Sequence, residues 1–118
     1  MTAINQDFSM HAGDTKVISL TVKDANGSVV NLTGLLKAQF VVKNYANSTT
    51  ELITKTLGSG ITNGSPSLGI LEITIDATSS ASLNAGEYYH ETRIKDTNSN
   101  IGTVTTGTLT VKSATTLS

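Results

Sequence analysis

The stretch LNAGEYYHETRIKD, residues 83 to 96, contains two of the three tyrosines in a chain that has few aromatic residues. In one common class of β-sandwich, a tyrosine near the start of the sixth strand anchors the preceding corner, two residues before an inward-facing core position. Leu83, Tyr88 and His90 reproduce this spacing. We therefore expect the Tyr88 hydroxyl to bond the backbone near Leu83, and His90 to occupy the core position.

Strand alternation divides the same stretch between two faces. The inner face is predicted to hold Tyr88, His90, Thr92 and Ile94, and the outer face Tyr89, Glu91, Arg93 and Lys95. Tyrosine and arginine are favoured at protein interfaces, so the outer row is a candidate contact surface. The alternative is a solvated strand face with weak ion pairs. Tyr45, in a polar loop, and Phe8, at the end of an expected N-terminal arm, are further candidate interface residues.

Period-2 patterns dominate the rest of the chain, and strands are predicted over 7–10, 15–23, 29–30, 36–43, 52–56, 70–76 and 102–111. The segment 36–43 places Leu36, Ala38, Phe40 and Val42 inward. Residues 58–69 are interpreted as a long turn region, and the segment after Asp76 as room for one helical turn. Gly107 indicates a bulge or a close backbone approach. The pattern predicts an all-β, immunoglobulin-like antiparallel β-sandwich of about seven or eight short strands, with a barrel as the competing architecture.

The length of 118 residues fits one domain over 1–118. Its core is expected over about 7–111, with an N-terminal arm at 1–6 and a C-terminal tail at 113–118. The absence of cysteine excludes a disulfide framework, and a net charge of −1 argues against nucleic acid or an anionic membrane as partner. The sequence has no apolar run long enough to cross a bilayer, and its start lacks the features of a signal peptide.

No catalytic, cofactor-binding or metal site is expected. His11 and His90 are the only histidines and lie far apart in sequence, and no G-x-S-x-G nucleophile motif is present. Calcium is a weak alternative at DTNSNIG, residues 96–102. In this loop Ile101 stands at the sixth position, where a calcium loop needs a glycine for its sharp turn, and no glutamate closes the loop at the twelfth position. That loop and DANGS, residues 24–28, are interpreted as hairpin turns.

Three segments together resemble the small immunoglobulin-like proteins of tailed bacteriophage particles, including baseplate upper protein-like and capsid accessory types. They are DFSMHAGDTKVISLTVKDANGSVVNLTG at 7–34, LITKTLGSGI at 52–61 and AGEYYHETRIKDTNSNIGTVTTGTLTV at 85–111. The shared pattern is an aromatic residue before AGDT, a D-x-x-G hairpin, LTG, and AG-x-Y before the penultimate strand. The resemblance covers nearly the whole chain.

The resemblance implies a non-enzymatic structural protein of a virion, assembled in the bacterial host cytoplasm. Its partners would be other tail, baseplate or capsid proteins, and it would be present in many copies or as a homo-oligomer. The alternative is a carbohydrate- or host-surface-binding module on the particle, with weak glycan binding through Tyr45, Tyr89 and His11.

Overall fold

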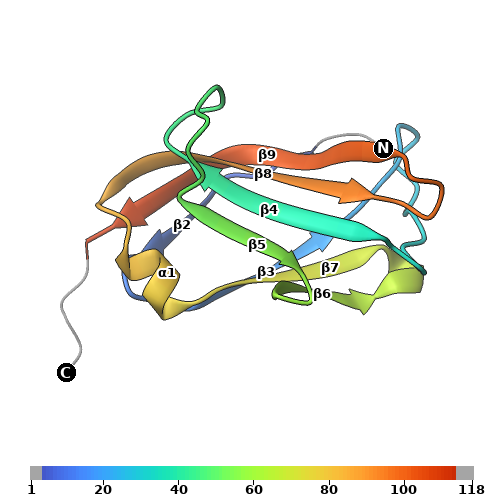
Figure 1. Ribbon diagram of the computed structural model, residues 1–118, viewed down its shortest axis with the longest axis horizontal. Coiled ribbons are helices and arrows are strands. Elements are labelled where there is room, and N and C mark those ends of the chain that lie inside the picture. The colour runs from blue at the N-terminus through green and yellow to red at the C-terminus, as the bar shows by residue number, and fades with distance from the viewer. Residues whose placement is uncertain (1–3, 114–118) are drawn as a thin grey trace.

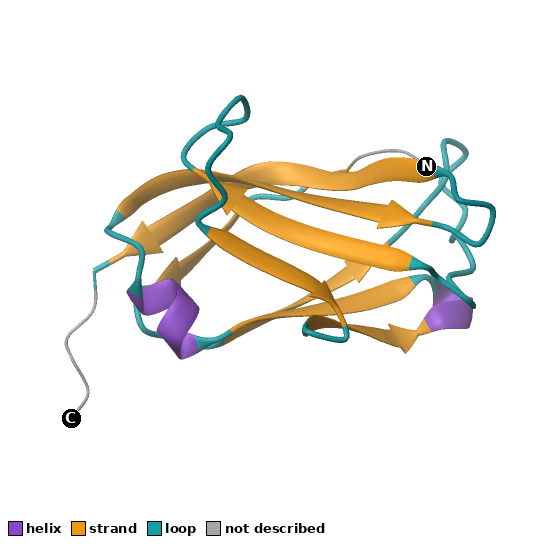
Figure 2. Cartoon of the chain, viewed as in Figure 1, coloured by secondary structure: helices purple, strands orange, loops and turns teal. Residues whose placement is uncertain are grey.

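Nine strands and two short helical segments account for most of residues 4–113, the part of the chain that the computed structural model describes (Figure 1). The strands are β1 (Ile4–Asn5), β2 (Phe8–His11), β3 (Lys16–Thr21), β4 (Lys37–Lys43), β5 (Ile53–Leu57), β6 (Gly60–Ser65), β7 (Ile70–Ile75), β8 (Gly86–Lys95) and β9 (Ile101–Lys112). The helix α1 spans Ala77–Ala81, and the 3-10 turn η1 spans Pro66–Leu68. Figure 2 shows how little of the ribbon is helical.

The strands form two layers. In one layer β5, β4, β8 and β9 pair in that order, and both β1 and β2 run parallel to β9. In the other, β6, β7 and β3 pair antiparallel, and a short parallel pair between β5 and β6 joins the two layers at one edge (Figure 1). This strand order is that of an immunoglobulin-like sandwich. The predicted fold class, an all-β immunoglobulin-like sandwich, is therefore confirmed.

Alternating side chains fill the space between the layers. Ala38, Phe40 and Val42 of β4 are buried, as predicted, and they belong to one hydrophobic cluster with Leu71 and Ile73 of β7. Fully burying a side chain of this size stabilises the fold by about 1.5–3 kcal/mol. The alternation thus fixes which side of each strand remains available for binding.

Leu36 does not follow the predicted alternation. We expected it to point inward, but its side chain is 50% exposed. The reason is that β4 begins one residue later, at Lys37, and the Leu36 amide donates to the Lys95 carbonyl oxygen at 3.0 Å from a loop conformation. Leu36 is therefore a surface residue at the end of β4.

The N-terminal arm expected over 1–6 is also corrected. Ile4 and Asn5 pair with Thr105 and Thr106 of β9, and the Gln6 amide donates to the Thr106 carbonyl oxygen at 2.8 Å. Pairing with β9 satisfies backbone groups that a free arm would leave to water. Residues 1–3 of the arm and 114–118 of the expected tail lie outside the described residues.

The region 58–69, interpreted from sequence as a turn, contains β6. Gly60–Ser65 pairs with β7, and Ile61 is buried opposite Ile73. Tertiary pairing overrides the local preference of its glycines and polar residues. By contrast, the short strand expected at 29–30 is reduced to one bridge between Val29 and Lys23.

Candidate binding surface

The inner face of β8 is structural. The Tyr88 hydroxyl donates to the Asn84 carbonyl oxygen at 2.6 Å, one residue beyond the buried Leu83. His90 is buried, with its ring centroid 4.9 Å from that of Phe8. Its Nε2 lies 2.6 Å from the Gln6 carbonyl oxygen, and since a carbonyl only accepts, Nε2 carries the proton. The expected corner residues thus lie at the corner and in the core.

The outer face of β8 carries the predicted row, and two of its members are already paired. The Tyr89 hydroxyl donates to Glu91 Oε2 at 3.1 Å, and Lys43 Nζ lies 3.6 Å from Glu91 Oε1. The pKa of Tyr89 is raised above its ordinary value. Partial burial is the main cause, and the negative charge of Glu91 and the hydrogen bond to it add to the effect. This end of the row is therefore internally satisfied and neutral.

The other end of the outer face is hollowed. A shallow hollow of about 600 Å³ lies over the ends of β4, β5, β8 and β9. Its lining consists of Leu36, Lys37, Ala38, Gln39, Thr56, Leu57, Arg93, Ile94, Lys95 and Ile101. Ile101 is 62% exposed, so with Leu36 it gives the hollow an apolar rim beside the charged side chains.

The cations of this hollow are not neutralised. Lys37 lies directly opposite Lys95 in the β4–β8 pair, and Arg93 is two residues along β8. Within residues 4–113, no carboxylate lies within salt-bridge distance of these three side chains. Like charges directly opposite each other on a sheet are destabilising. The fold therefore concentrates positive charge here, although the whole chain has a net charge of −1.

Only one strand of this surface is predictable from the sequence. Alternation along β8 predicts Arg93 on the outer row, but Lys37, Gln39 and Ile101 join this surface through the pairing of β8 with β4 and β9. Alternation marked Lys37 and Gln39 as outward-facing, but it did not give their partner strand.

Two candidate interface residues lie elsewhere. Phe8 is partly buried against the core and the His90 ring, with Lys16 Nζ 5.9 Å from its ring centroid, so it belongs to the packing of β2. Tyr45 is 63% exposed in the loop that follows β4. Because Lys43 pairs with Tyr89, this loop lies at the end of the outer face away from the hollow.

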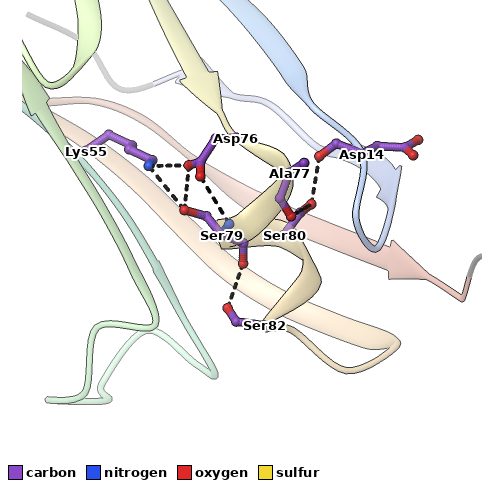
Figure 3. A network of polar contacts seen from close by, with 7 residues as sticks. All are labelled: Asp14, Lys55, Asp76, Ala77, Ser79, Ser80 and Ser82. Atoms are coloured by element: carbon purple, nitrogen blue, oxygen red, sulfur yellow. Dashed lines mark hydrogen bonds and ion pairs between the residues drawn. The ribbon is translucent and has the colours of Figure 1, made fainter. Parts of the chain in front are cut away.

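A second polar cluster surrounds the start of α1 (Figure 3). Lys55 Nζ lies 2.6 Å from Asp76 Oδ1 and 3.2 Å from Ser79 Oγ, and the Ser79 hydroxyl donates to Asp76 Oδ1 at 2.6 Å. The hydrogen bonds from Lys55 and then Ser79 hold the pKa of Asp76 well below its ordinary value.

A serine beside a lysine could suggest a nucleophile and its base, but a base must give up its own proton first. Lys55 Nζ instead donates to both Asp76 Oδ1 and Ser79 Oγ, so it is not placed to accept the Ser79 proton. Asp76 also accepts the Ser79 amide at 3.3 Å as the N-cap of α1. We therefore interpret this cluster as a cap that fixes α1 to β5.

The two suspected calcium loops are closed by their own aspartates. Asp96 Oδ1 accepts the amides of Asn98 and Asn100, each at 2.9 Å. Asp24 Oδ1 accepts the amides of Asn26 and Ser28 in the same way. Both loops are hairpin turns, as predicted.

Other site chemistry is sparse in the described part of the chain. His11 Nδ1 lies 3.9 Å from Asp14 Oδ2, and no three acidic or histidine side chains in residues 4–113 gather as a metal-binding group. None of the helical segments in these residues has the length and apolar character needed to cross a membrane.

No family model matches the chain, and no curated protein matches it. Among solved structures, the chain is similar to CopC from Methylosinus trichosporium OB3b, with a TM-score of 0.50 and 14% sequence identity. The match covers 99% of this chain and 91% of that one. At this identity the likeness establishes the β-sandwich fold.

This comparison overturns the expected virion role. CopC is not a phage protein, so the assignment to a tail, baseplate or capsid and the virion location are withdrawn. The glycan-binding alternative is withdrawn with them, because it too placed the chain on a phage particle.

Proposed function

We propose that the chain is a non-catalytic recognition module that binds an acidic segment of a partner protein in the hollow of its outer sheet face. The observation that carries the proposal is the facing pair Lys37 and Lys95, with Arg93 beside them and no carboxylate of residues 4–113 within salt-bridge distance. A partner carboxylate would relieve the repulsion between the two lysines and bond the guanidinium in a planar, two-point geometry.

The partner segment is expected to be acidic and partly apolar. Leu36, Leu57 and Ile101 line the same hollow as the cations, so an aliphatic side chain can lie beside a bound carboxylate. Nucleic acid fits this surface less well, because its binding sites combine long basic tracks with aromatic stacking platforms. Tyr89, the aromatic residue of this row, is already bonded to Glu91.

The binding is expected to be weak and sensitive to salt. Exposed ion pairs contribute about 0.2–1 kcal/mol each, and salt screens them over a Debye length of about 8–10 Å. Such an affinity suits a contact that is repeated or combined with others.

The test uses the 15N-labelled protein and a capped peptide of alternating glutamate and leucine. Titration is expected to shift the amide signals around Lys37, Arg93 and Lys95, and added salt is expected to reverse the shifts. A matched lysine–leucine peptide is the charge control. Equal shifts with both peptides, or no shifts with either, would show the proposal to be wrong.

Lys95→Glu is the most informative variant. It places a carboxylate opposite Lys37, so the fold should gain about 0.2–1 kcal/mol while peptide binding is lost. Lys23→Glu changes the net charge equally at an exposed position in the turn after β3, and it should bind like the wild type. If a DNA oligonucleotide shifts the same signals more strongly than the acidic peptide, the hollow binds polyanions in general, and the proposal of an acidic protein segment is wrong.

As a separate proposal, we infer that the chain shares an evolutionary origin with the small immunoglobulin-like family described above. This proposal makes no statement about the role or the location of the chain. It is supported by the order of the turn motifs and by the bond between Tyr88 and Asn84. A sequence profile that aligned AGDT, LTG and AG-x-Y in this order would test it.

A further inference from the structure

The strand β3 ends the hydrogen-bonded order of the sheet. It pairs with β7 over six consecutive residue pairs, Lys16↔Ile75 to Thr21↔Ile70, and no other strand in the described residues pairs with it. Figure 1 shows β3 running alongside β7 at this side of the molecule. An edge of this kind presents unpaired backbone donors and acceptors to any strand that can align with them.

The other edges of the sandwich are protected. At the β9 side the edge is divided between two residues in β1 and four in β2, with an interruption at Gln6 and Asp7. The strand β6 pairs with β5 only through Gly60 and Ile61, and beyond this short pairing it shifts register against β7 between Thr62 and Ser65. Short strands and bulges prevent an edge from accepting a new strand. By contrast, β3 has no proline and no register shift, and its one charged residue, Lys16, stands at its start.

One hydrogen bond shows which backbone groups of β3 point toward the open edge. The Val22 amide donates to the Gly69 carbonyl oxygen at 2.8 Å, on the β7 side. Because the direction alternates along a strand, Leu20 and Ile18 also turn their backbone groups toward β7. Val17, Ser19 and Thr21 therefore turn theirs toward the open edge.

This edge is complementary to itself. In an antiparallel pair of two copies centred on Ser19, Ser19 meets Ser19, and Val17 meets Thr21 of the other copy. Each of these residues then has an outward-facing residue opposite it, so the amides and carbonyls of all three can bond across the interface. The pairing places β-branched side chains together and brings no like charges into opposition. Val17, which is 55% exposed, would gain a neighbour in this arrangement.

We propose that two copies of this chain associate through β3, edge to edge and antiparallel, to form one continuous sheet of six strands from the two β6-β7-β3 layers. The site is independent of the cationic hollow, which lies on the other layer and does not enter the interface. Main-chain hydrogen bonds would provide most of the affinity, as in other cases of strand addition.

The test is sedimentation equilibrium of the full chain over a range of concentrations, combined with hydrogen exchange of the β3 amides. A dimer is expected to form as concentration rises, and exchange at Val17, Ser19 and Thr21 is expected to slow with it. A chain that stays monomeric up to millimolar concentration, with rapid exchange at these amides, would overturn the proposal.

Two variants separate this interface from any other. Ser19→Pro removes the central outward donor, and Ser19→Lys brings two lysines face to face; each is expected to raise the dimer dissociation constant about tenfold or more. Thr74→Lys places the same charge one strand inward, on β7 opposite Val17, and should leave the dimer intact. If Ser19→Pro fails to fold, Ser19→Lys decides the outcome. A dimer that persists unchanged in Ser19→Lys contradicts the proposed pairing.

Discussion

The Nε2 atom of His90 donates a hydrogen bond to the Gln6 carbonyl oxygen at 2.6 Å and so joins residues 84 positions apart. Gln6 lies at the interruption between β1 and β2, and Gly107 of β9 pairs with His90 from the other side. The Thr108 amide also donates to Asp7 Oδ1 at 2.9 Å. The His90 side chain of β8 and the Asp7 side chain therefore fix the segment between β1 and β2 to β8 and β9, at the point where its own strand pairing is interrupted.

His90 should make stability depend on pH. Burial lowers the pKa of His90 below its ordinary value, and the bond to Gln6 and the Asp7 charge oppose this only in part. Below about pH 6.5 the unfolded chain binds a proton that the folded chain refuses, so the unfolding free energy falls as pH falls, by at most about 1.4 kcal/mol per pH unit. Urea unfolding at pH 7.5 and 5.5 measures this fall.

His90→Gln should remove this dependence, because its amide can still donate to Gln6 but does not titrate. His11→Gln removes the other histidine, which is exposed, and should retain most of the fall. If the pH dependence disappears in His11→Gln and persists in His90→Gln, then His11 causes the effect and the prediction for His90 is wrong.

Gly107→Ala should loosen the N-terminal strand. A Cβ atom at position 107 would overlap the Gln6 carbonyl oxygen, which is backbone and has little freedom to move aside. Such overpacking typically costs about 1–3 kcal/mol. We expect faster amide exchange in β1 and a weakened contact between His90 and Gln6. Thr106→Ala, one residue away on the outer face, is the control and should leave exchange in β1 unchanged.

The sequence was sufficient to place Gly107 and Tyr88 because each follows a local rule. A glycine inside a strand indicates a close backbone approach, and a tyrosine after a corner bonds back to it. The two-face division of residues 88–95 likewise depends only on period-2 alternation, and the burial of His90, Thr92 and Ile94 agrees with it.

The hollow could not be predicted because it depends on pairing between distant strands. Lys37 and Lys95 are neighbours only because β4 and β8 align in one particular register, and single-sequence alternation does not specify register between strands. The β6 strand was missed for a related reason. Its sequence favours turns, and burial of Ile61 against β7 determines its conformation.

Tyr88→Phe should measure the value of the corner. The change keeps the ring that packs against the core and removes the hydroxyl that donates to the Asn84 carbonyl oxygen. A loss of about 0.5–1.5 kcal/mol in the unfolding free energy is expected, the usual net value of one hydrogen bond. Tyr89→Phe deletes the hydroxyl bonded to Glu91 on the outer face and should cost less. Equal losses in the two variants would contradict a special role for the corner.

Lys55→Met should weaken the cap of α1 in a way that depends on pH. In the wild type, the bond from Lys55 holds the pKa of Asp76 below its ordinary value. The stability linked to this carboxylate is present at neutral pH and is lost as pH falls below about 4, where the unfolded chain takes up the proton first. The variant should therefore be less stable than the wild type at pH 7, and the difference should narrow in acid. Urea midpoints at pH 7 and pH 3 measure this.

Lys43→Met, which removes the ion pair with Glu91 and leaves Asp76 untouched, is the control. An offset between Lys55→Met and the wild type that is the same at both pH values would mean that Lys55 acts through packing and not through the charge of Asp76.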